Sequence, residues 1–309
     1  MNRYFREWSV AGALAAALIA LGILAPNFYD AQPLLSRLTR ETPVLLVACG
    51  MALVIISRQI DISVGSIFAV CGVCAGMLAV KGLPLAVVAV VSIAAGAALG
   101  AINGALVAGL GLPSIVVTLA TMVAWREALR WKTQGQFVNL PAGTQWFGLD
   151  QTGGQTLVIL VGAAIFIGLA WATRNIAAAR RVYAVGSNAE AARLAGIRPR
   201  ATTFGVFVLL GALTGFAALL NVVQSPQVDP KSGTGLELRA IAACVVGGVA
   251  ISGARGNLWG VLMGFLLLAC INPALIHLRV EAYWEKAIQG AIILLAVLAD
   301  GLRQRAGKH

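Results

Sequence analysis

One charged segment interrupts the apolar body of the chain without a normal polar loop around it. It runs from Arg58 through Asp61 to Ser66 and separates two long apolar runs. Ionisable groups so placed are candidates for function by default if the runs cross a membrane. Gly65 permits a tight break, and Asp61 can cap the following helix at its positive end. The hydroxyls of Ser63 and Ser66 can satisfy backbone groups freed at the break.

Two interpretations of Asp61 stay open. In the one that we favour, Asp61 caps the next helix and pairs with Arg58 at the membrane edge, without contacting any ligand. In the other, the same break lines a path through the membrane, and Asp61 contacts the molecule that passes.

A second segment, Gly186–Ile197, has the composition of a short helix within a long basic loop. Ser187 or Asn188 can cap its start, the following residues are good helix formers, and Gly196 can stop it. Its alanine-rich face, from which Glu190 projects, suits docking into a groove on another protein. The alternative is a helix that lies on the lipid surface, but such helices carry more large apolar side chains.

Residues that commonly carry catalysis or bind metals are scarce. The chain has two histidines, His277 and His309, and no metal-ligand spacing, so we expect no metal site. A nucleotide-binding P-loop needs the pattern G-x4-G-K-[ST], which the chain lacks. We therefore expect no catalytic residues and no cofactor bound by this chain. Any ATP and magnesium that drive its function would be bound by another subunit.

The composition is that of a protein embedded in a bilayer. Apolar residues make up 59% of the chain and charged residues 11%, and the mean hydropathy is +0.87. These values exclude an ordinary soluble domain. The net charge of +11 does not indicate nucleic-acid binding, because the basic residues fall in loops between apolar runs. We expect a single transmembrane domain over residues 1–309.

The apolar runs predict an all-α polytopic bundle of about ten membrane helices. Several runs are shorter than the roughly 20 residues that a perpendicular helix needs, so some helices are expected to be short or broken. The predicted spans are 9–25, 43–57, 64–80, 84–110, 113–125, 155–173, 202–220, 238–252, 258–273 and 286–299.

The distribution of basic residues predicts the orientation. Loop 174–201 carries six arginines against one glutamate, Glu190, which places it on the cytoplasmic face. Counting spans outward from this loop puts both termini on the same side, where basic residues also lie. The loops 126–154, 221–237 and 274–285 would face outward.

A weak internal repeat relates two halves of the chain. Ala48-Cys49 and Ala243-Cys244 align at an offset of 195 residues, together with several apolar and glycine positions. Transporters often contain such repeats. The halves would cover about 1–173 and 202–309, joined by the cytoplasmic loop 174–201.

The short helix carries the first family resemblance. Its residues match the E-A-A-x-x-x-G signature of binding-protein-dependent ABC importer permeases, which the chain resembles. In that family this cytoplasmic helix couples the permease to the ATPase. The resemblance therefore implies that ATP-binding cassette subunits, which bind ATP and magnesium, dock on Glu190, Ala191, Ala192 and Gly196.

Two further segments resemble the monosaccharide permeases related to the ribose importer. Gln59–Ser66 is similar to their G-x-I-D-L-S-V-G-S stretch, although Arg58-Gln59 stands where paired glycines are usual. Gly235–Gly248, followed by Gly256–Gly260, also fits this group. The resemblance implies that two breaks, near 61–66 and 253–260, help to shape the translocation path. The candidate residues are Arg58, Asp61, Ser63, Gly65, Ser66, Gly256 and Gly260.

The substrate is also suggested by resemblance. Pro113–Met122, Trp125–Glu127 and Tyr283–Gly290 most resemble rhamnose importer permeases, whose relatives import autoinducer-2. In such systems a periplasmic binding protein supplies most of the specificity. Rhamnose is the implied substrate, with autoinducer-2 or another pentose or hexose as the alternative.

The resemblance further implies a mechanism and a location. Two ATPase subunits would rock two permease subunits, identical or related, between inward-facing and outward-facing states in the bacterial inner membrane. A loaded periplasmic binding protein would dock on the outer face. The direction of transport would be import.

Two other classes of protein remain as alternatives. An ion-coupled secondary transporter would also show many spans, a repeat and broken helices, but it needs buried coupling groups, for which Asp61 is the main candidate. A polytopic membrane enzyme needs a paired acid, base or metal site. Glu281 and Glu285 share a helix face, yet no base clusters near them in the sequence.

Overall fold

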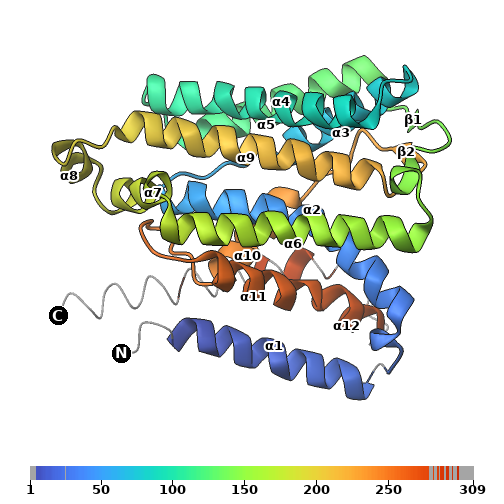
Figure 1. Ribbon diagram of the computed structural model, residues 1–309. Coiled ribbons are helices and arrows are strands. Elements are labelled where there is room, and N and C mark those ends of the chain that lie inside the picture. The colour runs from blue at the N-terminus through green and yellow to red at the C-terminus, as the bar shows by residue number, and fades with distance from the viewer. Residues whose placement is uncertain are drawn as a thin grey trace.

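The helices of the computed structural model lie side by side in one bundle, with their long axes roughly aligned (Figure 1). The structure describes residues 5–24 and 26–277, and beyond these only 281, 284, 286–288, 290, 291, 294 and 298. Much of the predicted span 286–299 and the basic C-terminal end therefore lie outside the described residues. The described part is helical apart from turns, loops and one pair of two-residue strands, which confirms the predicted all-α fold class.

The described residues form twelve α-helices, three shorter helical turns and two short strands. The strands pair antiparallel at the end of the bundle opposite α7 and α8 (Figure 1). The α-helices are α1 (Phe5–Leu24), α2 (Ala31–Ile56), α3 (Val64–Val80), α4 (Leu85–Gly104), α5 (Ser114–Thr133), α6 (Gln151–Asn175), α7 (Ala177–Ser187), α8 (Ala189–Leu194), α9 (Pro199–Val222), α10 (Leu236–Val246), α11 (Leu258–Ala269) and α12 (Ile271–His277). The turns and strands are η1 (Pro26–Tyr29), η2 (Ala105–Gly109), η3 (Gln145–Gly148), β1 (Val138–Asn139) and β2 (Gln227–Val228).

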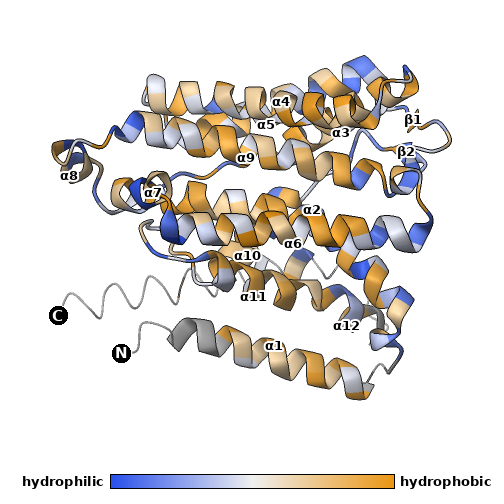
Figure 2. Cartoon of the chain, in the orientation of Figure 1, coloured by the Kyte–Doolittle hydropathy of each residue, from blue (hydrophilic) through white to orange (hydrophobic). Residues whose placement is uncertain are grey.

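The helix lengths and composition are those of a multi-pass membrane protein. Hydrophobic residues follow the long helices in Figure 2, and hydrophilic residues gather toward the ends of the bundle. Two apolar stretches, Val10–Ile23 and Val64–Val80, are shorter. Five described stretches are long and apolar enough to cross a bilayer: Ala31–Ile56, Leu85–Gly109, Gln151–Asn175, Pro199–Val222 and Leu258–Leu275.

Several helices differ in extent from the spans predicted for them. α2 begins at Ala31, well before the predicted start at 43, because its first turns carry polar residues outside the apolar run. The helix expected over 113–125 continues as α5 to Thr133, because the charged residues after its apolar part are good helix formers. The run 238–252 holds only the short helix α10, which ends at Val246. Gly248 has a φ of 92°, a left-handed conformation that ends a right-handed helix.

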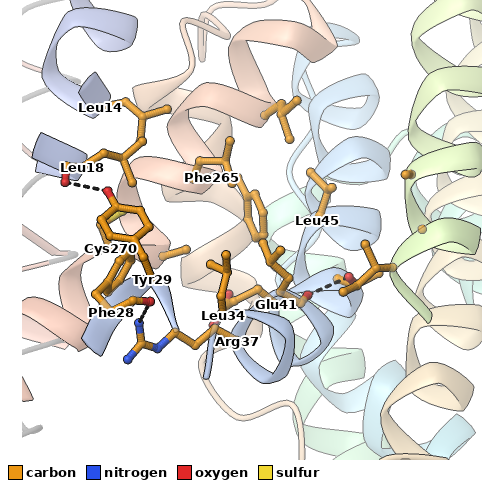
Figure 3. Close-up of a pocket in the computed structure, with 18 residues that line it drawn as sticks. Leu14, Leu18, Phe28, Tyr29, Leu34, Arg37, Glu41, Leu45, Phe265 and Cys270 are labelled. Carbon is orange, nitrogen blue, oxygen red and sulfur yellow. Dashed lines mark hydrogen bonds between the residues drawn. The ribbon is translucent and has the colours of Figure 1, made fainter. Parts of the chain in front are cut away.

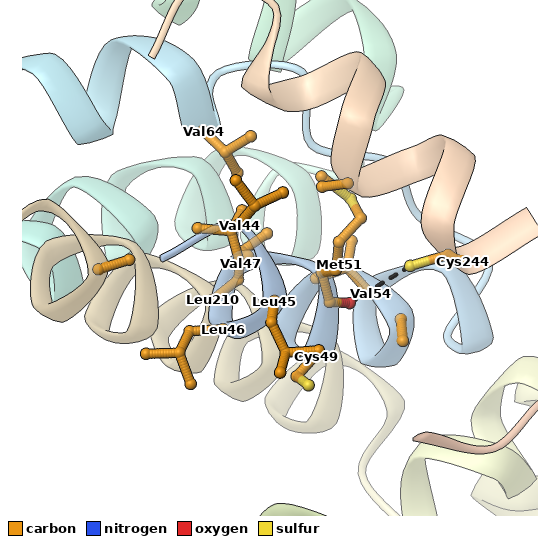
Figure 4. Packing of buried hydrophobic residues seen from close by; sticks show 14 of the residues in the cluster. Val44, Leu45, Leu46, Val47, Cys49, Met51, Val54, Val64, Leu210 and Cys244 are labelled. Atoms are coloured by element: carbon orange, nitrogen blue, oxygen red, sulfur yellow. Dashed lines mark hydrogen bonds between the residues drawn. The ribbon is translucent and has the colours of Figure 1, made fainter. Parts of the chain in front are cut away.

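α2 is the central helix and is buried on all sides along much of its length. The side chains from Leu46 to Cys49 are fully buried, and Figure 4 shows Leu46, Val47 and Cys49 on α2 with neighbouring helices beside it. A helix that is hydrophobic all round belongs in the interior of a bundle. The thiol of Cys244, on α10, donates to the carbonyl oxygen of Ala48 at 3.3 Å. The offset of 195 residues thus relates two helices that pack on each other, while the repeat itself stays a prediction.

α4 and α9 approach so closely that glycine backbones touch across their interface. A Cβ atom added at Gly96 would overlap the carbonyl oxygen of Gly211, and one at Gly100 would overlap that of Phe207. The hydroxyl of Ser92 donates to the carbonyl oxygen of Gly215 at 2.8 Å. Small residues at four-residue spacing let membrane helices pack at this distance, where van der Waals contact replaces the hydrophobic effect.

Gly100→Val is expected to lower the stability of the bundle by about 1–3 kcal/mol or more, because the new side chain meets backbone that cannot rotate away. Gly12→Val is the matched control, since a Cβ atom at Gly12 has no neighbour within 4 Å. Thermal unfolding of both variants in detergent measures the difference. Equal melting temperatures in the two variants would contradict the tight packing of α4 on α9.

α1 lies at one edge of the bundle and leaves a cavity of about 250 Å³ between itself, α2, α6 and α11 (Figure 3). The walls of this cavity are almost wholly apolar. Arg37, at its rim, lies 4.5 Å from the centre of the Phe28 ring and donates to the Phe28 carbonyl oxygen at 3.1 Å. The hydroxyl of Tyr29 donates to the carbonyl oxygen of Leu18 at 2.7 Å. The turn after α1, η1, is therefore held by hydrogen bonds to both α1 and α2 at this rim.

Candidate functional site

The break between α2 and α3 is held by a buried polar network. Asp61 is fully buried, and one of its carboxyl oxygens accepts from the backbone N–H of Ser63 at 2.8 Å and from its hydroxyl at 2.6 Å. The amide nitrogen of Asn103, on α4, donates to the other carboxyl oxygen of Asp61 at 3.3 Å and to the Ser63 hydroxyl at 2.8 Å. The hydroxyl of Thr121, on α5, donates to the Asn103 amide oxygen at 2.9 Å. The network joins α4 and α5 to the break.

The predicted pairing of Asp61 with Arg58 is wrong. Arg58 turns away and donates from its guanidinium to the carbonyl oxygen of Ser187 at 2.8 Å. Its φ of 64° lies in the left-handed region that favours glycine. This conformation agrees with the glycines that are usual at this position in the monosaccharide permeases that the segment resembles. Asp61 also does not bond the free N–H groups of the first turn of α3. It closes the turn before the helix by accepting from Ser63, the N-cap residue.

Hydroxyl groups of α5 satisfy the irregular backbone of this break. The N–H of Ile60 donates to the Ser114 hydroxyl, and the N–H of Ile62 donates to the Thr118 hydroxyl, each at 3.2 Å. Free backbone groups inside a membrane need such partners. Neither these residues nor Asn103 were predicted to belong to the site. The sequence does contain a pattern that indicates them, because the hydroxyl residues at 114, 118 and 121 share one helix face in an otherwise apolar run.

Asn103→Leu is expected to destabilise the break by about 1–3 kcal/mol, because one carboxyl oxygen of the buried Asp61 loses its donor. Asn175→Leu is the control, since Asn175 is exposed and bonds only within its own helix. Thermal unfolding of the two purified variants measures the effect. If Asn103→Leu melts at the temperature of the control, the network does not hold the break.

The other predicted residues of the first break lie where α3 begins. The Ser66 hydroxyl donates to the carbonyl oxygen of Ser63 at 2.7 Å, as expected for a group that satisfies freed backbone. A Cβ atom at Gly65 would overlap the carbonyl oxygen of Gly233 and the carboxylate of Glu237. Gly65 is therefore required for contact between the starts of α3 and α10.

Gly256 and Gly260 lie at the second break, between α10 and α11. The side chain of Asn257 caps α11 by accepting from the backbone N–H of Gly260 at 2.7 Å. A Cβ atom at Gly260 would overlap the carbonyl oxygen of Gly247, so this glycine lets the two helices pack tightly. The structure thus places both predicted glycines at a helix break and gives Gly260 a packing role.

The two breaks and the end of α7 meet in one place, which we call the junction: residues 56–58, 183–187 and 253–256. The backbone N–H of Ala254 donates to the carbonyl oxygen of Ile56 at 2.9 Å. The Tyr183 hydroxyl donates to the carbonyl oxygen of Gly256 at 3.1 Å. Burial raises the pKa of Tyr183 above its usual value, although Arg174 acts in the opposite direction, so the hydroxyl stays a donor.

α7 packs into the junction without a gap. A Cβ atom at Gly186 would overlap the carbonyl oxygen of Ile56, the same atom that binds Ala254. The guanidinium of Arg58 reaches the next residue of α7, Ser187. The helix that precedes α8 is therefore in direct contact with both breaks.

α8 forms as predicted and projects from the bundle (Figure 1). Asn188, one of the two predicted caps, accepts from the backbone N–H groups of Glu190 and Ala191 at 3.0 Å each. Gly196 follows the helix with a φ of 80°, the left-handed conformation expected of a glycine stop. Ala192 is buried against the bundle, whereas Leu194 is 81% exposed.

The exposed face of α8 carries an ion pair and an apolar tip. Arg193 donates to the carboxylate of Glu190 at 2.6 Å, and both side chains are about two-thirds exposed. Leu194, next to this pair, is a large apolar side chain turned to the outside. Such a combination is typical of a small docking element, in which one apolar anchor is surrounded by polar groups.

The chain matches known proteins over nearly its whole length. A family model described as "Branched-chain amino acid transport system / permease component" matches residues 34–297. The autoinducer 2 import system permease protein LsrC of Enterobacter sp. (strain 638) is 35% identical over 308 residues, covering 98% of this chain and 89% of the relative. The ribose import permease protein RbsC of Escherichia coli (strain K12) is 32% identical over 313 residues, covering 98% of both chains. No solved structure matches the chain.

These relatives align with the segments in which the family signatures lie. The matched range includes both breaks, the junction and α8. The chain therefore belongs to the family of ABC importer permeases for monosaccharides.

Proposed function

We propose that the chain is the membrane-spanning permease subunit of an ATP-driven, binding-protein-dependent importer for a small sugar. The observation that carries this proposal is the exposed helix α8, whose Glu190-to-Gly196 signature continues directly into the α7 end of the junction. A subunit that pushes or pulls α8 would act through packed contacts on both helix breaks. The chain would form the translocation path and transmit motion through α8, and partner ATPase subunits would bind ATP and magnesium.

The proposed orientation places the α7 and α8 end of the bundle in the cytoplasm, at the bacterial inner membrane. α1 begins at this same end (Figure 1), which supports a cytoplasmic N-terminus. The proposed cytoplasmic C-terminus lies outside the described residues. The partners are two ATP-binding cassette subunits, a second permease subunit, identical or related, and a periplasmic sugar-binding protein on the outer face.

Glu190→Gln and Gly196→Val are expected to uncouple ATP hydrolysis from transport. The first removes an exposed ion pair that contributes little to stability, and the second strains the left-handed turn that orients α8. We expect sugar uptake to fall at least about tenfold, because each change misplaces the docking element by a short distance. Uptake and ATPase rate are measured on the same reconstituted complex.

Arg200→Gln is the control for these variants, since Arg200 is exposed in the first turn of α9, outside the signature. Normal coupled uptake in the Glu190 and Gly196 variants would remove the coupling role of this segment. A lowered melting temperature in detergent would show instead that the changes act through folding.

We propose rhamnose as the first candidate substrate, on the resemblance of 113–122, 125–127 and 283–290 to rhamnose importer permeases. Autoinducer-2 is the second candidate, because a relative that covers 98% of this chain is named for its import. Uptake of labelled rhamnose by cells that express the complete importer tests the choice. Competition by unlabelled rhamnose, ribose or autoinducer-2 then ranks the substrates, and competition by autoinducer-2 alone would overturn rhamnose.

We propose that Asp61 supports the path by holding the first break in shape. Both of its carboxyl oxygens accept from donors of the chain itself, which supports a structural role. Asp61→Asn tests whether it also contacts the substrate. Unchanged uptake kinetics at intact expression would leave only the structural role, and a raised KM for the sugar would assign a contact.

A further inference from the structure

A cavity of about 820 Å³ opens between α6, α7 and the start of α9. Leu53 of α2 lines it, together with other apolar side chains such as Leu169 and Val206. Its volume lies within the range of about 300–1,000 Å³ that is typical of small-molecule sites. Its walls include the end of α6 and the start of α9, two helices that are long and apolar enough to cross a bilayer, so the cavity lies at one end of the apolar spans.

The rim of this cavity carries two arginines that have no acidic partner among the described residues. Arg181, on α7, and Arg198, just before α9, both line the cavity and are exposed. The one glutamate of loop 174–201 is engaged by Arg193. Arg37, at the rim of the smaller cavity beside α1, is by contrast engaged by the Phe28 ring and carbonyl oxygen.

A mostly apolar lining with guanidinium groups at its rim fits an amphiphilic anion. Guanidinium groups bind phosphate in a forked geometry, and basic pockets between membrane helices hold the head groups of anionic lipids. We propose that this cavity binds one anionic phospholipid of the leaflet at the α7 and α8 end. Its phosphate would lie between Arg181 and Arg198, and an acyl chain would lie along the apolar walls.

The site lies directly beside the coupling segment, since Gly196 and Ile197 also line the cavity. A bound lipid would therefore fill the space between α7 and the turn after α8. Two features favour a lipid as the occupant: the positive charge of the rim, which complements an anionic head group, and the position of the cavity at the side of the bundle. The occupant is independent of which sugar the chain transports.

The test uses the permease copurified with its ATPase and reconstituted in nanodiscs of phosphatidylcholine with a minor share of phosphatidylglycerol. Native mass spectrometry counts the phosphatidylglycerol molecules that stay bound. Arg181→Gln with Arg198→Gln is expected to lower retention about 30-fold, since each arginine that lies next to the head group contributes about fivefold to anionic-lipid binding. Arg180→Gln with Arg200→Gln removes the same charge from neighbours outside the cavity and should leave retention unchanged.

A third variant separates a lipid from a free anion. A Cβ atom at Gly205, which lines the cavity, has no neighbour within 4 Å, so Gly205→Leu fills the space without displacing backbone. We expect this variant to lose phosphatidylglycerol as well. If retention depends on the arginines but not on Gly205, the site binds only phosphate, which overturns the proposal. Equal retention of phosphatidylglycerol by the two double-arginine variants also overturns the proposal. So does a loss of the ATPase from Arg181→Gln with Arg198→Gln while the lipid stays bound, because the rim would then bind the partner protein.

Discussion

Gly186→Val is expected to abolish sugar uptake while the ATPase subunit still binds. Gly186 lies on α7 where a Cβ atom would overlap the carbonyl oxygen of Ile56. That oxygen also accepts from the backbone N–H of Ala254, so valine must displace α7 from both breaks at once. The clash is with backbone, and no side-chain rotation relieves it. α8 is untouched, so the docking surface remains.

The melting temperature distinguishes a specific loss of transport in Gly186→Val from general misfolding. Overpacking of this kind costs about 1–3 kcal/mol, which a membrane bundle can tolerate while its transport step fails. Gly168→Val is the matched control, because a Cβ atom at Gly168 has no neighbour within 4 Å. Uptake into proteoliposomes, ATPase copurification and melting temperature are measured for both variants. Wild-type uptake by Gly186→Val would contradict a mechanical role for the junction.

Leu194→Asp is expected to prevent stable association with the ATPase. Leu194 is 81% exposed at the end of α8, beside the Glu190–Arg193 ion pair. Truncation of a central apolar anchor costs about 2 kcal/mol or more, and a buried unpaired carboxylate adds to this. We therefore expect the affinity for the ATPase to fall at least about 30-fold. The folded bundle should keep its melting temperature, since the side chain contributes little to the interior.

Leu149→Asp provides the control, because Leu149 is 51% exposed at the opposite end of the bundle, before α6. It makes the same chemical change far from α8. The permease is held in nanodiscs on a sensor surface, and its affinity for the purified ATPase is measured by surface plasmon resonance. If both variants lose affinity equally, or neither does, Leu194 is not the anchor.

The sequence predicts best the elements whose ends carry local signals. α3 has the predicted bounds, because polar residues limit its apolar run on both sides. α8 was predicted for the same reason, since Asn188 caps it and Gly196 stops it. These signals act within one helical turn and do not need the rest of the fold.

Contacts between distant segments could not be predicted in this way. Arg58 bonds Ser187, 129 positions away, and the local pattern suggested Asp61 as its partner instead. The Asp61 network depends on Asn103, 42 positions away, on another helix. A single sequence gives no pairing between helices, because many apolar faces are equivalent in a membrane bundle. α7 was missed because its basic residues were assigned to a loop.

The most direct test of the proposed function is sugar uptake by proteoliposomes that contain this chain and its ATPase, with the loaded binding protein on the outer face. We expect labelled sugar to accumulate only when ATP is hydrolysed, and the flux to stop with Glu190→Gln or Gly186→Val. Uptake by this chain alone, driven by a proton gradient and indifferent to ATP, would contradict the proposal and assign a secondary transporter.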